Sequence, residues 1–219
     1  MFGDKRSGRI QIKICGITNT ADALAAVNCG ADALGFNLYP QSKRYIDLEA
    51  ARDWIDELPG DVYKVAVLVN PTAEEAIRIG ESACIDALQL HGQESPQFCR
   101  GLTDRGIRFA KAVPVTSARS LIELPSFHTD TLVLDSASPG KFGGTGKTFP
   151  WEWAHRFVET HALFNVILAG GLAPENVAQA LREVRPYGVD VTSGVESSPG
   201  RKDSNRLKAF VEAVRSFGS

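Results

Sequence analysis

Cysteine is scarce in this sequence, and none of it stands at a spacing that holds a metal ion. The four cysteines, at positions 15, 29, 84 and 99, lie apart from one another and from any pair of histidines. We therefore expect no metal site built on these cysteines. Disulfides are also not expected, because a chain of 219 residues buries a sizeable core without such links.

The sequence also lacks long runs of one charge and long runs of apolar residues. The net charge is −2, and the basic residues near the start, Lys5, Arg6 and Arg9, are too few to form a nucleic-acid-binding arm. No apolar stretch approaches the ~20 residues that span a bilayer, and residues 1–8 have no apolar signal core. We therefore expect a cytoplasmic protein with neither a nucleic-acid nor a membrane partner.

Short apolar runs alternate with helical patterns along the chain. The predicted strands are 11–15, 33–37, 63–69, 87–91, 108–113, 131–135, 165–169 and 188–192, and the predicted helices are 20–29, 48–58, 73–83, 96–103, 118–124, 151–161, 174–184 and 204–217. Strands separated by helices pair in parallel. Eight such units in this length favour an α/β fold, a closed (β/α)8 TIM barrel, over an open doubly wound sheet. We expect residues 1–8 to be a tail and residues 9–219 to be one barrel domain.

Several helix starts are marked in the sequence. Thr72 precedes the predicted helix at 73–83, and Glu75 stands three residues later, which is the pattern of a capping box. Pro150 and Pro174 suit a first helical turn, where the missing N–H costs no hydrogen bond.

The first predicted strand combines an apolar face with a reactive side chain. In 9–18, RIQIKICGIT, isoleucines alternate with Gln11, Lys13 and Cys15, and Gly16 ends the run. A thiol at the end of a barrel strand opens into the mouth where such barrels place their active sites. A strand with a wet outer face would produce the same alternation, so the strand alone assigns no function.

Asp135 ends the sixth predicted strand, three steps around an eight-membered ring from the first. Cys15 and Asp135 are therefore expected to face each other across the mouth, where a thiol and a carboxyl can serve a sugar phosphate as general base and general acid. Lys13 would favour the thiolate electrostatically, and an apolar mouth would keep Asp135 protonated. The alternative for Asp135 is a helix cap or a surface ion pair.

Three glycine-bearing loops follow the last three strands: 143–147 (GGTGK), 169–172 (AGGL) and 192–196 (TSGVE). Glycines let backbone N–H groups approach a phosphate closely. Late loops of such barrels commonly bind phosphate with a short extra helix, for which 197–200 is the candidate. These glycines could instead form tight turns only, but three such loops in consecutive units favour phosphate.

Further polar residues lie within the predicted strands. Gln89 and His91 share one face of the fourth strand, where His91 is either a structural residue or a second proton-transfer group. Lys13, Lys111 and Asp190 interrupt otherwise apolar strands. Buried charges need partners, so we expect an ion network among these three residues.

Arg44 lies in the loop after the second predicted strand, within the segment 42–44 (SKR). A guanidinium at the mouth of a barrel can hold a carboxylate in a bidentate fork. An ordinary solvent-exposed basic loop is the alternative.

Seven segments together carry a resemblance to a known family. They are KICGIT at 13–18, GADALGFNLYPQSKRYI at 30–46, LQLHG at 88–92, LVLDS at 132–136, GGTGKTF at 143–149, ILAGGLAPENV at 167–177 and GVDVTSGVESSPGRKD at 188–203. In these segments the chain resembles the phosphoribosylanthranilate isomerase family of tryptophan biosynthesis, a family of (β/α)8 barrels that needs no metal or cofactor.

The resemblance implies roles for particular residues. The family's general base falls on Cys15, its general acid on Asp135, and the arginine that binds the anthranilate carboxylate on Arg44. The family's phosphate-binding glycines match Gly143, Gly144, Gly146, Gly170, Gly171 and Gly194. Apart from the resemblance, we expect Ser193 to bind the phosphate as well and Lys13, His91 and Asp190 to bind the substrate. Thr192 stands where serine is frequent and Pro150 where aspartate is frequent, and neither departure removes a needed group.

The implied reaction is an aldose–ketose isomerisation, the Amadori rearrangement of N-(5-phosphoribosyl)anthranilate, by a monomer or homodimer acting on a small molecule. A related sugar isomerase of histidine biosynthesis is the nearest alternative, although its first strand carries an aspartate where Cys15 stands. A phosphate-barrel lyase or transferase would instead place an acidic pair at the mouth. A non-catalytic phosphosugar-binding barrel would have no need of both Cys15 and Asp135.

Overall fold

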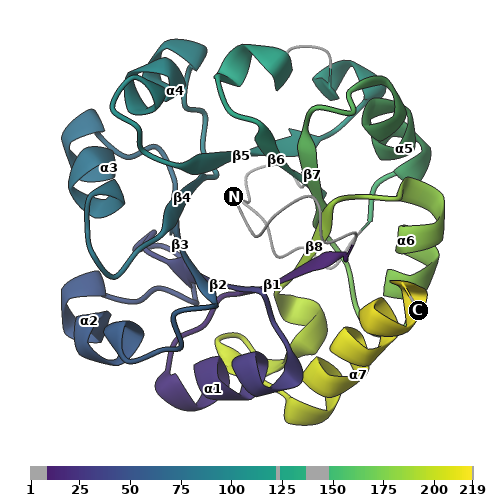
Figure 1. Cartoon of the computed structure of the whole chain (residues 1–219), viewed down its shortest axis with the longest axis horizontal. Helices are drawn as coiled ribbons and strands as arrows, with labels where there is room; N and C mark the ends of the chain where they lie inside the picture. The colour runs from purple at the N-terminus through teal and green to yellow at the C-terminus, as the bar shows by residue number, and fades with distance from the viewer. Residues whose placement is uncertain (1–8, 122–123, 137–147, 219) are drawn as a thin grey trace.

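The computed structural model describes residues 9–121, 124–136 and 148–218, and its strands close into a barrel ringed by helices (Figure 1). Eight parallel strands follow one another around the barrel in chain order: β1 (Gln11–Cys15), β2 (Ala33–Asn37), β3 (Tyr63–Leu68), β4 (Ala87–Leu90), β5 (Phe109–Val115), β6 (Thr131–Ser136), β7 (Asn165–Leu168) and β8 (Gly188–Val191). β8 pairs with β1 and closes the ring. The expected (β/α)8 barrel is confirmed.

The outer ring consists of α1 (Thr20–Cys29), α2 (Leu48–Asp56), α3 (Ala73–Gly80), α4 (Pro96–Thr103), α5 (Trp151–Thr160), α6 (Val177–Val184) and α7 (Ser204–Arg215). The cap expected at Thr72 is present, because its hydroxyl accepts the backbone N–H of Glu75 at 3.1 Å. Across the described ranges, no helix is long and apolar enough to cross a bilayer.

The helix expected at 118–124 is not an α-helix in its described part. Two short 3-10 turns, η2 (Ala118–Leu121) and η3 (Leu124–Phe127), take its place. The Ser120 hydroxyl accepts the backbone N–H groups of Thr116 and Ser117, each at 3.3 Å. Pro125 has no N–H to donate. Local side-chain bonds and a proline thus replace the i to i−4 bonding of an α-helix.

The helix predicted at 151–161 begins at Trp151 as expected, with Pro150 as its N-cap residue and not in its first turn. The start of the next helix is wrong by three residues. α6 begins after Asn176 and not at Pro174. The Asn176 side chain accepts the backbone N–H of Ala173 and donates to the carbonyl of Gly171, both at 2.9 Å, which shapes a turn before the helix.

The short extra helix expected at 197–200 is also not present. It lies in a hairpin of two antiparallel strands, β9 (Glu196–Ser198) and β10 (Arg201–Lys202). The short helical turn near the eighth strand is η4 (Ser193–Val195), which directly follows β8.

Both faces of β1 are buried, so the alternative of a wet outer face is excluded. Ile12 and Ile14 belong to the large apolar cluster between the barrel and the helices. Lys13 and Cys15 alternate with them and therefore point into the barrel. A second apolar cluster has four alanines, Ala33, Ala110, Ala112 and Ala169, beside Val65, Val133 and Ile167. Small side chains leave room inside the barrel for polar groups.

Candidate active site

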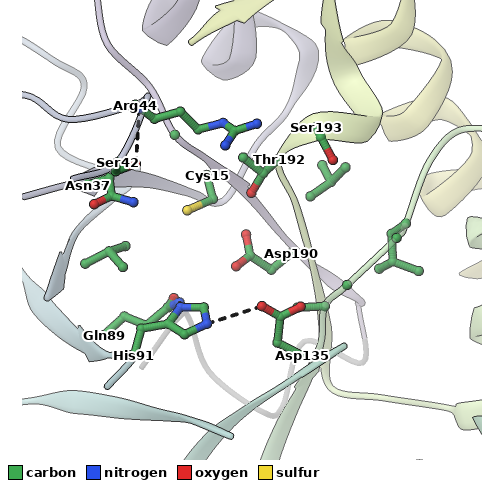
Figure 2. Close-up of a pocket in the computed structure, with 17 residues that line it drawn as sticks. Cys15, Asn37, Ser42, Arg44, Gln89, His91, Asp135, Asp190, Thr192 and Ser193 are labelled. Carbon is green, nitrogen blue, oxygen red and sulfur yellow. Dashed lines mark hydrogen bonds and ion pairs between the residues drawn. The ribbon is translucent and has the colours of Figure 1, made fainter. Parts of the chain in front are cut away.

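A pocket opens at the carboxyl ends of the barrel strands (Figure 2). Eight of the residues expected to bind or transform a substrate line it: Cys15, Arg44, His91, Asp135, Gly170, Gly171, Asp190 and Ser193. In Figure 2, Cys15 and Asp135 enter from different sides, with Asp190 between them in this view. The barrel therefore brings the thiol and the carboxyl to one pocket, and the wall beside them is built from Asn37, Ser42, Gln89 and Thr192.

Gly35 on β2 makes room for the reactive end of β1. A Cβ placed on Gly35 would lie 2.7 Å from the Cys15 sulfur and 2.9 Å from the Lys13 nitrogen. Both distances are shorter than ordinary van der Waals contact. The ammonium and the thiol are thus packed against the same glycine, and Lys13 lies where the sequence predicted a cation near Cys15.

Lys13 and Asp190 form an ion pair inside the barrel, with Lys13 Nζ donating to Asp190 Oδ2 at 2.9 Å. Burial opposes the charge on Lys13, but Asp190 and Cys15 outweigh it, and the pKa of Lys13 is raised. The other carboxylate oxygen of Asp190 is buried, and no donor within the described ranges reaches it. Asp190 therefore presents an acceptor to the pocket.

The ion network expected among three residues is only partly present. Lys111 is not joined to Lys13 and Asp190. Its ammonium instead pairs with Glu94 at 2.8 Å and donates to the carbonyl of Gly92 at 2.8 Å. Gly92 and Glu94 belong to the segment between β4 and α4, so this segment holds Lys111 of β5. The pair thus ties the loop to the barrel beside the pocket.

Arg44 is fixed in position by a carboxylate from the other end of the chain. Its Nε donates to Glu196 Oε1 at 2.8 Å and its Nη2 to Glu196 Oε2 at 2.6 Å. Lys202 Nζ also donates to Glu196 Oε1, at 3.1 Å, and to the carbonyl of Cys15, at 2.6 Å. The cluster joins the loops after β1, β2 and β8. The N–H groups on Arg44 Nη1 and one N–H on Nη2 lie outside this two-bond fork to Glu196.

The charges in this cluster shift one another's titration. Burial alone would raise the pKa of Glu196, but the hydrogen bonds and charges of Arg44 and Lys202 outweigh it and the pKa is lowered. The hydrogen bond to Glu196 raises the pKa of Arg44. Burial lowers the pKa of Lys202 despite the neighbouring carboxylate. Glu196 is therefore held as a carboxylate between two cations.

His91 and Asp135 are in direct contact across the pocket, as the dashed line in Figure 2 shows. His91 Nε2 lies 3.2 Å from Asp135 Oδ2, and His91 Nδ1 lies 3.1 Å from Gln89 Nε2. Asp135 is almost fully buried and belongs to β6. Its partner is a pocket histidine, so Asp135 is neither a helix cap nor part of a surface ion pair.

The expected phosphate-binding glycines do not all meet at the pocket. Gly170 and Gly171 line it and have positive φ angles of 80° and 66°, a conformation that glycine adopts without strain. Gly194 packs against the backbone of Leu172, where a Cβ would overlap the carbonyl oxygen. Gly143, Gly144 and Gly146 lie outside the described residues.

Sequence reasoning missed the partners that hold the predicted site residues. Glu196 and Lys202 lie in a segment quoted for its motif, yet neither was singled out, because charged residues in a loop after a strand are usually solvated. Glu94, the partner of Lys111, was missed for the same reason.

Among the described residues, no group of three or more His, Cys, Asp or Glu is arranged to hold a metal ion.

Comparison with known proteins places these features in a family context. The model of the N-(5'-phosphoribosyl)anthranilate (PRA) isomerase family matches residues 12–213. The N-(5'-phosphoribosyl)anthranilate isomerase of Geobacter sp. (strain M21) is 47% identical over 205 residues, covering 94% of this chain and 98% of that protein. The crystal structure of phosphoribosyl anthranilate isomerase from Thermotoga maritima is similar with a TM-score of 0.87 and 42% identity, over 94% of this chain and 99% of that one.

A second crystal structure shows a related protein with a bound small molecule. It is phosphoribosyl anthranilate isomerase in complex with reduced 1-(o-carboxyphenylamino)-1-deoxyribulose 5-phosphate. Its TM-score is 0.82 at 39% identity, over 94% of this chain and 99% of that one. The similarity thus extends over nearly the whole barrel in both comparisons.

Proposed function

This chain belongs to the N-(5'-phosphoribosyl)anthranilate isomerase family, and on that premise we propose that it rearranges N-(5-phosphoribosyl)anthranilate with Cys15 as general base and Asp135 as general acid. The product is 1-(2-carboxyphenylamino)-1-deoxyribulose 5-phosphate, an intermediate of tryptophan biosynthesis. The observation that carries the proposal is that Cys15 and Asp135, from strands three steps apart in the ring, line one pocket.

The proposed mechanism uses the two groups in turn for proton transfer. Asp135 gives its proton to the furanose ring oxygen while the bond from that oxygen to C1 breaks, which opens the ring to a protonated Schiff base. The Cys15 thiolate then removes the proton from C2, and the electron pair of that C–H bond neutralises the iminium to form an enolamine. Tautomerisation of the enol gives the ketone. Each group is typically worth a factor of ~10²–10⁴.

Lys13 supports the thiolate that this step requires. Its ammonium shares the space beside Gly35 with the Cys15 sulfur, and its charge is retained because its pKa is raised. A fixed cation in a buried setting favours a neighbouring thiolate over a thiol. The same lysine is already paired with Asp190, so it serves both groups.

The two ends of the substrate have suitable partners in the pocket. The N–H groups of Arg44 that lie outside the fork to Glu196 are available to the anthranilate carboxylate, with charge-assisted hydrogen bonds. The unpaired oxygen of Asp190 accepts a sugar hydroxyl. Gly170, Gly171 and Ser193 provide backbone N–H groups for the phosphate. Anchoring both ends holds C2 between thiol and carboxyl.

A continuous fluorescence assay that follows loss of phosphoribosylanthranilate tests the proposal. We expect turnover by the purified protein without added metal or cofactor. In parallel, the phosphoribosyl aminoimidazole carboxamide substrate of histidine biosynthesis should be turned over far more slowly. Binding of phosphoribosylanthranilate without turnover would instead support a non-catalytic barrel, and preference for the second substrate would support the histidine-pathway isomerase.

A further inference from the structure

We propose that Gln89 is a positioning residue that keeps the proton of His91 on Nε2 and so directs it at Asp135. The proposal deepens the function proposed above, because it assumes that Asp135 is the general acid. Three residues from two strands and one loop form a line: Gln89 on β4, His91 just beyond it, and Asp135 on β6.

The tautomer follows from the chemistry of the amide. Gln89 Nε2 lies 3.1 Å from His91 Nδ1, and an amide NH2 group can only donate a hydrogen bond. With the amide in this orientation Nδ1 accepts, and the proton of a neutral imidazole resides on Nε2. That nitrogen lies 3.2 Å from Asp135 Oδ2. Gln89 is only 1% exposed, so little of its side chain is open to bulk solvent.

The direction of this bond suits an acid that must lose its proton. With His91 donating to Oδ2, the other oxygen of Asp135 is left to carry the proton toward the substrate. When Asp135 gives up that proton, the bond from His91 becomes charge-assisted and stronger. A donor aimed at charge that develops during the reaction stabilises the transition state more than the ground state.

The charged groups around Gln89, His91 and Asp135 have partners of their own. Asp190 on β8 lines the same pocket, and its charge is engaged by Lys13 from β1. Cys15 lies near that pair. Lys111 on β5 is paired with Glu94. Within the described ranges, the groups that titrate and share the pocket with His91 are therefore Asp135, Asp190, Cys15 and Arg44.

Nuclear magnetic resonance tests the tautomer directly and without substrate. Two-bond proton–nitrogen correlations distinguish the two imidazole tautomers, and a His91→Gln variant assigns the His91 signals among the four histidines. We expect the Nε2–H form in the wild-type protein. A wild-type Nδ1–H form would overturn the proposal, even if the enzyme turns over phosphoribosylanthranilate. Loss of the proposed function, in contrast, would appear as absent turnover with the tautomer unchanged.

Two substitutions extend the test to catalysis. Gln89→Leu removes the donor, so we expect a mixture of tautomers and a roughly tenfold fall in kcat, part of the ~10²–10⁴ that a general acid contributes, with KM changed by less than about twofold. Gln89→Glu replaces the donor with an acceptor and should move the proton to Nδ1, with a larger fall in kcat.

The matched control is Gln11→Leu. Gln11 is another buried glutamine of a barrel strand, but its amide donates to the Arg9 carbonyl at the opposite end of β1. This variant should leave kcat and the His91 signals unchanged. Unchanged kcat in Gln89→Leu, or an equal loss in Gln11→Leu, would contradict a positioning role for Gln89.

Discussion

Lys13 on β1 and Asp190 on β8 stand directly opposite each other in the strand register, and their charged groups meet at 2.9 Å inside the barrel. The Lys13 side chain is 1% exposed and that of Asp190 6%. The pair therefore lies across the seam where the last strand closes on the first. It also places a cation beside Cys15 and an acceptor in the pocket.

Breaking this pair from one side should be costly. Lys13→Met leaves Asp190 buried without its partner, and we expect a loss of about 3–5 kcal/mol in the free energy of unfolding. The double variant Lys13→Met/Asp190→Leu removes both charges and should recover part of that loss. Urea denaturation followed by circular dichroism measures both. A double variant less stable than the single one would show that the charge left on Asp190 is not the cause.

The same pair predicts how stability changes with pH. The pKa of Lys13 is raised in the folded state, so its contribution is complete below the ordinary value of 10.5 and is lost as the pH rises through the folded pKa. The difference in unfolding free energy between wild type and Lys13→Met should be constant near neutrality and shrink only above pH 10.5. A difference that already declines between pH 7 and 9 would be inconsistent with this.

The two proton-transfer groups should each be indispensable for turnover. Cys15→Ala and Asp135→Asn should each lower kcat by a factor of ~10²–10⁴ while the fold survives. Cys29→Ala, which alters a half-buried cysteine on α1, is the matched control and should retain full activity. Near-normal kcat in either site variant, with circular dichroism like wild type, would remove that residue from its role.

The guanidinium of Arg44 should act mainly in binding. Arg44→Ala is expected to raise KM more than it lowers kcat, because a fixed anchor for a carboxylate contributes to substrate and transition state alike. Arg52→Ala is the control, since Arg52 pairs with Glu49 on the exposed face of α2. Initial rates over a range of substrate concentrations separate the two constants. An unchanged KM in Arg44→Ala would exclude this anchor.

Glu196 should make the stability of the protein depend on pH in the acid range. Its pKa is lowered because Arg44 and Lys202 outweigh burial, so its contribution to stability is present above 4.5 and is lost as the pH falls through the folded value. Glu196→Gln should therefore be less stable than wild type near neutrality, and the gap should close on acidification. Thermal unfolding between pH 3 and 7 measures the gap, and a gap independent of pH would argue against the ion cluster.

A single methyl group should disturb the thiol and the lysine together. In Gly35→Ala the new Cβ would lie within 3 Å of the Cys15 sulfur and the Lys13 nitrogen, and overpacking of this kind typically costs 1–3 kcal/mol. We expect lower stability and lower kcat. Gly101→Ala in α4, where no atom lies within 4 Å of the new Cβ, should instead preserve kcat and gain about 0.5–1 kcal/mol.

The barrel itself could be predicted from the sequence, because periodicity is a local property. Alternation of apolar residues marks a strand wherever that strand later packs, and β1, β2, α1 and α4 have the predicted bounds. The prediction of a helix at 118–124 was wrong for a local reason as well, since Ser120 within the segment and Pro125 directly after it favour turns that apolar periodicity does not reveal.

The positions of Cys15 and Asp135 at one mouth followed from strand order alone, since parallel strands of a closed ring end on the same side. The partners of the charged residues could not be predicted from strand order. Glu196 is 152 positions from Arg44, and Lys111 pairs with Glu94 where the sequence suggested Lys13 and Asp190. A charge is satisfied by whichever opposite charge the folded chain brings within about 3 Å, and only the tertiary structure sets those distances.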